Sequence, residues 1–187
     1  MQEEIKKASI ILKNGGIILY PTDTIWGIGC DATNYDAVQK IIDIKKRSKS
    51  KSFIVLVENE IRLEQTIEEV PKAAWDLIKY SEKPLTIIYD RPKGIASNAI
   101  NSDNSLGVRL VRDYFCEELI RLINKPIIST SANLSGKPSA KCFSDISDEI
   151  KNSVDHIVNL RQNYNESQHN SSIIKLNKSG LIKIIRA

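Results

Sequence analysis

Apolar and polar positions repeat along this chain with two periods, one typical of amphipathic helices and one of strands. Residues 35–44 show the helical period clearly, because Val38 and Ile41 share an apolar stripe. Asn34 precedes this stripe as a suitable N-cap. The predicted helices cover residues 2–14, 35–44, 62–67, 71–80, 113–123 and 144–151. The predicted strands cover residues 17–20, 53–57, 85–89, 106–111, 126–129, 156–160, 172–176 and 181–185. This interspersed order predicts a mixed α/β fold.

The strand predicted over residues 17–20 ends in a cluster of hydroxyl and carboxylate side chains. Pro21 has no N–H and a fixed φ angle, so it ends the strand or begins a tight turn. Thr22, Asp23 and Thr24 follow it directly. Polar groups held at the end of a strand are a usual place for a small-molecule site in α/β proteins. A simpler interpretation is a strand and a turn, with two nearby glycines that relieve backbone strain.

A run of cations follows the helix predicted over residues 35–44. Lysine and arginine occupy five of the seven positions in residues 45–51, and no acidic residue lies among them. Such a run is usually a solvated loop. Here it lies between a predicted core helix and the buried strand predicted over residues 53–57, so its charges can point at one place. Binding a polyphosphate requires such a focus of positive charge.

Length and composition are those of an ordinary globular protein, and we expect one domain covering residues 1–187. The net charge of +4 allows weak attraction to nucleic acids or nucleotides without requiring it. The three cysteines are far apart and form no C-x-x-C pair, so we expect reduced thiols and no zinc site. No apolar stretch approaches the roughly 20 residues that span a bilayer. With no signal-peptide core at the N-terminus either, we expect a cytoplasmic protein without membrane contact.

Several common catalytic motifs are missing from the sequence. The P-loop, the G-x-G-x-x-G fingerprint and the Gly-x-Ser-x-Gly motif do not occur. His156 and His169 have no partner at metal-ligating spacing, and a lone histidine is more often structural. What remains is a set of cations, hydroxyls and amides without an obvious nucleophile. This set suits a reaction in which the substrates supply the nucleophile while the protein positions them and stabilises charge.

Three segments, in this order and spacing, make the chain similar to a known family. They read Tyr-Pro-Thr-Asp-Thr at 20–24 with Gly-Ile-Gly at 27–29, Ile-Lys-Lys-Arg at 44–47, and Ser-Thr-Ser-Ala-Asn-Leu-Ser-Gly at 129–136. Together they resemble the YrdC-like family of threonylcarbamoyl-AMP synthases. The resemblance implies a single-domain, twisted, open mixed sheet with helices outside and a basic concave cavity. Because the chain ends at Ala187, we expect the family's short form, without its extra C-terminal domain.

The resemblance also implies a reaction. In this family the amine of L-threonine takes up bicarbonate or carbon dioxide, and the resulting carbamate attacks the α-phosphorus of ATP. Pyrophosphate leaves, and threonylcarbamoyl-AMP is the product. Mg²⁺ is implied as the companion of ATP, with no metal-binding residues assigned in this chain. The product is implied to pass to a separate threonylcarbamoyl transferase complex, which modifies tRNA.

Site residues follow from the matched positions. Lys45 and Arg47 match the family's Lys-x-Arg element, and we expect them to act in catalysis by clamping phosphates. The residues implied to hold L-threonine are Thr22, Thr24, Thr86, Arg109 and Ser171. The residues implied to hold ATP are Lys45, Arg47, Lys51, Ser131, Asn133 and Arg186. Arginine at position 109 can pair bidentately with the threonine carboxylate.

The chain departs from the family pattern in three internal segments. Residues 82–84 read Glu-Lys-Pro where the family usually has Pro-Gly-Pro, which puts that turn and its backbone contacts in question. Trp26 replaces the usual tyrosine, keeping an aromatic wall with a different polar edge. Residues 52–53 read Ser-Phe in place of Pro-Leu, which makes the end of the basic loop less rigid.

Two alternatives remain open at this point. The first is a non-enzymatic module that binds double-stranded RNA or tRNA through the same basic cavity, with an affinity that falls steeply with salt. Aromatic residues do not interleave with the cations of residues 45–51, as stacking on single-stranded RNA would require. The second is the related domain of carbamoyl-transferring maturation proteins, which use carbamoyl phosphate and carry extra zinc-finger domains. We favour the synthase over both, because the chain has no such zinc-finger domains, and its net charge allows weak RNA binding without requiring it.

Overall fold

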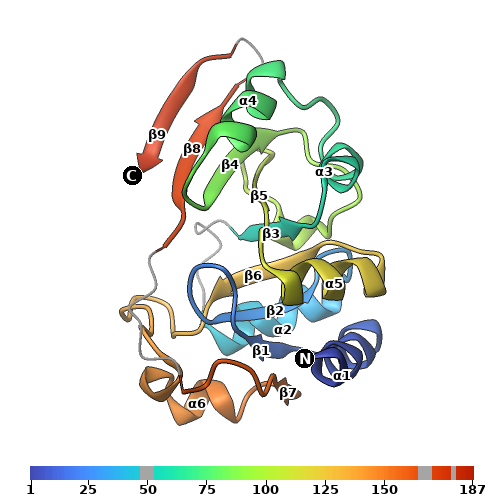
Figure 1. Cartoon of the computed structure of the whole chain (residues 1–187), viewed down its shortest axis with the longest axis vertical. Coiled ribbons are helices and arrows are strands. Elements are labelled where there is room, and N and C mark those ends of the chain that lie inside the picture. The colour runs from blue at the N-terminus through green and yellow to red at the C-terminus, as the bar shows by residue number, and fades with distance from the viewer. Residues whose placement is uncertain (47–52, 164–169, 178–179) are drawn as a thin grey trace.

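One twisted sheet organises the chain in the computed structural model, which describes residues 1–46, 53–163, 170–177 and 180–187 (Figure 1). Its strands are β1 (Ile18–Tyr20), β2 (Gly27–Asp31), β3 (Ile54–Val57), β4 (Leu85–Asp90), β5 (Ser105–Leu110), β6 (Ile127–Ser131), β7 (His156–Ile157), β8 (Ser172–Leu176) and β9 (Ile182–Arg186). Their order across the sheet is β7-β1-β2-β6-β3-β5-β4-β8-β9. The pairs β1–β7, β3–β5 and β4–β8 are parallel and the other neighbours antiparallel. The predicted open mixed sheet is therefore confirmed.

Helices lie on both faces of this sheet (Figure 1). They are α1 (Gln2–Lys13), α2 (Tyr35–Ile44), α3 (Glu60–Thr66), α4 (Lys72–Tyr80), α5 (Tyr114–Ile123) and α6 (Asp148–Lys151). Local capping explains where two of them begin. The Asn34 side chain accepts a hydrogen bond from Ala37 N at 3.1 Å, and Asp113 accepts one from Cys116 N at 3.0 Å. No helix in the described ranges is long and apolar enough to cross a membrane.

Alternate residues of each strand build two separate cores, one on each face of the sheet. Ile18, Tyr20 and Ile127 pack beneath α1 and α5. Leu19 and Ile128 point to the opposite face, which α2, α3, α4 and α6 cover. We call these the α1/α5 face and the α2 face. Both faces are apolar where helices cover them. Polar side chains on either face therefore indicate a part of the sheet that does not serve the core.

The sequence-based prediction missed one strand and overextended two elements. β2 was not predicted, although all five of its residues are buried. The helix predicted over residues 144–151 is only α6, preceded by a 3-10 turn over Phe143–Asp145. The strand predicted over residues 156–160 is the two-residue β7. The described residues of the expected loop over residues 161–170 are 161–163 and 170.

The two glycines of β2 serve close packing, and the simpler interpretation, in which they relieve backbone strain, is wrong. Neither Gly27 nor Gly29 has a positive φ angle. A Cβ atom on Gly29 would lie 2.6 Å from the Ile128 carbonyl oxygen and 2.7 Å from a ring carbon of Tyr20. The absence of a side chain therefore lets the Tyr20 ring lie directly on the strand, against the α1/α5 face of the sheet.

Candidate functional site

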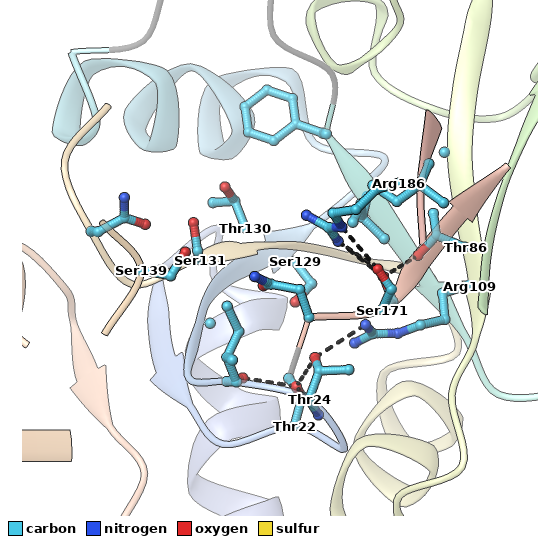
Figure 2. Close-up of a pocket in the computed structure, with 18 of the residues that line it drawn as sticks. Thr22, Thr24, Thr86, Arg109, Ser129, Thr130, Ser131, Ser139, Ser171 and Arg186 are labelled. Atoms are coloured by element: carbon cyan, nitrogen blue, oxygen red, sulfur yellow. Dashed lines mark hydrogen bonds between the residues drawn. The ribbon is translucent and has the colours of Figure 1, made fainter. Parts of the chain in front are cut away.

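A cavity of about 380 Å³ opens on the α1/α5 face, where the sheet extends beyond its covering helices. Along β6, Ile127 lies beneath the helices, whereas Ser129 and Ser131 on the same face line the cavity. β5 contributes Gly107 and Arg109 by the same two-residue spacing. Strand after strand, apolar side chains thus give way to small or polar ones. Side chains from six strands and the loop before β2 meet there (Figure 2).

The loop between β1 and β2 presents two threonine hydroxyls to the cavity. The Oγ1 atoms of Thr22 and Thr24 are 2.9 Å apart and hydrogen bonded. Thr22 Oγ1 also accepts a bond from Thr24 N at 3.0 Å and donates to Ile25 O at 2.8 Å. Both side chains are buried, so these bonds hold the loop in one conformation. The prediction that Thr22 and Thr24 lie together in a site is consistent with this geometry.

Arg109 is a buried cation of the cavity wall and carries an ion pair. Its Nη1 donates to Thr24 Oγ1 at 3.1 Å, and its Nη2 lies 3.1 Å from Asp23 Oδ1. Only 4% of the Arg109 side chain and 13% of the Asp23 side chain are exposed. The buried Arg109 Nε–H has no hydrogen-bond partner among the described residues. An unpaired, buried charged donor in a cavity wall is expected to bind an acceptor from a ligand.

A second polar cluster brings together residues far apart in the sequence. Thr86 Oγ1 and Ser171 Oγ lie 2.8 Å apart and share a hydrogen bond. Arg186, from the edge strand β9, donates to the Ser171 carbonyl through Nε at 2.9 Å and Nη2 at 2.7 Å (Figure 2). Partial burial and the positive charge of Arg109 lower the pKa of Arg186. Two arginines therefore face one cavity and repel each other, which favours an anionic ligand between them.

Lys45 reaches the cavity from the C-cap of α2, and it is 2% exposed. Its Nζ donates to the carbonyl oxygens of Ser131 at 2.5 Å and Asn133 at 2.6 Å. The Ser135 N–H in turn donates to the Lys45 carbonyl oxygen at 3.0 Å. The side chain and the backbone of Lys45 therefore both bind the segment that follows β6. In this state Lys45 holds the turn after β6 in place. Its expected part in phosphate binding stays a prediction.

The turn after β6 carries the remaining predicted nucleotide contacts. Ser131 and Asn133 both line the cavity. The Asn133 amide donates to Leu134 O at 3.0 Å and to Lys137 O at 2.6 Å, whereas its buried Oδ1 has no partner among the described residues. The Asn133 NH2 group therefore stabilises the turn, and its Oδ1 atom is available to accept a hydrogen bond from a ligand. Arg47 and Lys51 lie outside the described residues.

Most predicted site residues lie at one cavity, and the structure adds others. The predicted residues that line it are Thr22, Thr24, Lys45, Thr86, Arg109, Ser131, Asn133, Ser171 and Arg186. The lining residues that sequence reasoning missed include Ser129, Thr130, Lys137, Ser139 and Asn170. Ser129 was detectable, because it precedes Ser131 by two positions in a strand and so shares its face.

The charge of the lining is one-sided in the described part of the chain. Four of these lining residues are cations, namely Lys45, Arg109, Lys137 and Arg186, and none is a carboxylate. The basic character of the whole cavity stays a prediction, because residues 47–52 lie outside the description. No group of three or more histidine, cysteine, aspartate or glutamate side chains able to hold a metal occurs in the described residues.

The fold and this cavity define an α/β protein whose mixed sheet carries a polar cavity with cationic side chains on its α1/α5 face. Comparison with known proteins then gives the family. The family model for Sua5, YciO and YrdC proteins, described as "Telomere recombination", matches residues 10–187. The chain belongs to this family.

Relatives within the family carry one recurring name. The Hahella chejuensis protein named threonylcarbamoyl-AMP synthase is 30% identical over 153 residues, which cover 81% of this chain and 83% of the relative. The Pseudomonas aeruginosa protein of the same name is 33% identical over 135 residues, covering 72% of each chain.

Solved structures agree on the fold. P. abyssi Sua5, solved in complex with L-threonine, matches with a TM-score of 0.83 and 24% identity over 94% of this chain. The match covers 52% of that protein, so this chain spans about half its length. E. coli YciO matches with a TM-score of 0.85 and 23% identity, covering 100% of this chain and 89% of YciO.

Proposed function

We propose that this protein is an L-threonylcarbamoyladenylate synthase, which forms threonylcarbamoyl-AMP and pyrophosphate from L-threonine, bicarbonate or carbon dioxide, and ATP. The observation that carries the proposal is the convergence of buried hydroxyls and two arginines on the cavity of about 380 Å³. Family membership and the name shared by relatives at 30–33% identity support it.

The amino-acid end of the site is assigned to the loop before β2 and its neighbours. The Arg109 Nε–H, which has no partner in the described residues, binds the carboxylate of L-threonine, since a buried guanidinium favours that charge. The hydroxyls of Thr22, Thr24, Thr86 and Ser171 supply neutral donors and acceptors around the amino acid. The amine reacts with bicarbonate with loss of water, or with carbon dioxide with loss of a proton, and the resulting carbamate is the nucleophile of the reaction.

The nucleotide end is assigned to the turn after β6 and to Arg186. Ser131 and the unpaired Asn133 oxygen face ribose or phosphate groups, and Lys45 with Arg186 neutralises phosphate charge. A carbamate oxygen attacks the α-phosphorus, the bond from that phosphorus to the β-phosphate oxygen breaks, and pyrophosphate leaves. Arg47 and Lys51 complete this cluster in the proposal, although they lie outside the described residues.

Mg²⁺ is proposed to enter with the phosphates of ATP. A site held by the protein alone normally uses carboxylates, and the described cavity residues include none. The residues present therefore do not fit a resident metal, and the assigned roles of Arg109, Lys45 and Arg186 do not depend on one.

RNA binding without catalysis is the less favoured alternative. The relatives are named as an enzyme, and the polar groups gather in a concave cavity rather than along an open surface. We propose that the product passes to a separate threonylcarbamoyl transferase complex in the cytoplasm for tRNA modification, with any direct RNA contact weak.

The first test is pyrophosphate release by the purified protein. Release is expected only when L-threonine, bicarbonate and Mg·ATP are all present, and omission of any one should abolish it. Arg109→Ala should reduce kcat/KM at least about a hundredfold, because it removes a charged contact to the substrate. Arg121→Ala is the matched control, since Arg121 is an exposed arginine on α5 that lies outside the cavity lining. Release that does not depend on L-threonine would refute the proposal.

A further inference from the structure

We propose that Asp23 is a positioning residue, which holds Arg109 in the orientation that receives the substrate carboxylate. The inference rests on the proposed function and adds a residue to which no ligand contact has been assigned. Asp23 does not line the large cavity. It lines a separate cavity of about 140 Å³ together with Ser81, Glu82, Lys83 and Arg112. Asp23 and Arg109 therefore lie between two cavities and contact each other across the wall.

Two contacts, one hydrogen bond and one ion pair, orient the guanidinium before any ligand arrives. Thr24 Oγ1 accepts from Nη1 on one side, and Asp23 Oδ1 lies 3.1 Å from Nη2 on the other. The Nε–H is left as the buried donor without a partner in the described residues. Because the guanidinium is planar, holding two of its nitrogens sets the direction of the third.

Charge explains why Asp23 is needed. Arg109 is almost fully buried, which disfavours its charge, and it faces a second cation, Arg186, across the cavity. Both effects drive the guanidinium away from this position when the site is empty. The carboxylate of Asp23 opposes both, because it lies directly behind Arg109 at ion-pair distance. Thr24 alone supplies only a neutral hydroxyl.

The turn that departs from the family pattern borders the same wall. Glu82, Lys83 and Pro84 line the small cavity next to Asp23, so the charges of Glu82 and Lys83 lie on the far side of the ion pair from the substrate. Removing the charge of Glu82 leaves Arg109 and its contacts in place. Glu82→Gln therefore serves as a control that changes the small cavity without changing the ion pair.

The test compares Asp23→Asn with the wild type by calorimetric titration of L-threonine and by steady-state kinetics. We expect L-threonine binding to weaken about ten- to hundredfold, with the KM for ATP changed less than about twofold, because only the Arg109 contact is disturbed. Glu58→Gln is the stability control, because it uncouples a buried ion pair with Arg62, 3.2 Å long, outside the cavity lining. It should lower stability without changing either constant, and Glu82→Gln should change nothing.

A double variant separates positioning from general damage. If Asp23 acts through Arg109, then Asp23→Asn should have almost no further effect on L-threonine binding in an Arg109→Ala background. Unchanged or tighter L-threonine binding by Asp23→Asn would overturn the inference, as would equal losses for L-threonine and ATP. A wild type that does not bind L-threonine would instead overturn the proposed function and this inference with it.

Discussion

Gly29 in β2 gives a direct test of how tightly the sheet is packed beneath the site. An added Cβ atom would lie 2.6 Å from the Ile128 carbonyl oxygen and 2.7 Å from a Tyr20 ring carbon. The first contact is with the backbone of the paired strand β6, which has no side-chain rotation by which to move aside. We predict that Gly29→Ala forces β2 and β6 apart and displaces the Tyr20 ring.

The expected magnitude follows from two opposing terms. Overpacking a closely packed core costs about 1–3 kcal/mol, and two violated contacts favour the upper end of that range. Alanine recovers about 0.4–1 kcal/mol by restricting the unfolded chain. The free energy of unfolding should therefore fall by about 2 kcal/mol. For a chain of this length, that loss lowers Tm by about 4–8 °C.

Urea unfolding followed by circular dichroism measures this loss, with Gly27→Ala as the matched control. Gly27 lies two residues away in the same strand and on the same face, and its added Cβ would meet Ser129 Oγ at 3.0 Å. That side chain can rotate, so the cost should stay below about 0.5 kcal/mol. A Gly29→Ala variant as stable as Gly27→Ala would show that the packing argument is wrong.

Three further predictions concern the cap, a hydroxyl pair and acid stability. Asp113→Ala removes the N-cap of α5 and should lower the free energy of unfolding by about 1–2 kcal/mol, measured by urea unfolding; an unchanged value would contradict the capping role. Thr86→Val removes the hydroxyl that pairs with Ser171 and should weaken L-threonine binding about fivefold or more in a titration, whereas wild-type affinity would remove Thr86 from the site. The Asn159 N–H lowers the pKa of Glu4, so this carboxylate stabilises the fold fully above its unfolded pKa of 4.5 and loses that contribution as pH falls through the lower folded value. Glu4→Gln should accordingly flatten the acid limb of a stability–pH curve, and an unchanged limb would refute this assignment.

Most of the fold could be predicted from the sequence where one period dominates. α2 matches the predicted residues 35–44, because its apolar stripe and Asn34 cap agree with the tertiary structure. β2 escaped prediction since two of its five residues are glycines, which have low strand propensity, and their value lies in the approach of Tyr20 and β6. These contacts form only in the tertiary structure, so the local sequence pattern does not predict them.

In the candidate site, too, some residues could be predicted from the local sequence and others depend on tertiary contacts. Thr22 and Thr24 were identifiable from the polar cluster at a strand end, and Arg109 only through the family resemblance. The contact between Thr86 and Ser171 joins positions 85 residues apart, which requires the pairing of β4 with β8. The ion pair behind Arg109 was equally hidden, because only the bend of the loop before β2 turns Asp23 away from its neighbouring threonines.

The position of Arg186 on β9 makes the site depend on a local unfolding equilibrium. β9 lies at the edge of the sheet, where β8 is its strand neighbour in the described residues. All five residues of β9 are exposed. Few buried contacts oppose its detachment, so β9 should open more readily than the central strands. Each opening withdraws Arg186 from Ser171, and the apparent affinity for an anion then scales with the fraction of molecules in which β9 is docked. Amide hydrogen exchange along β9 should therefore slow when the cavity is filled, which makes this strand a reporter of occupancy.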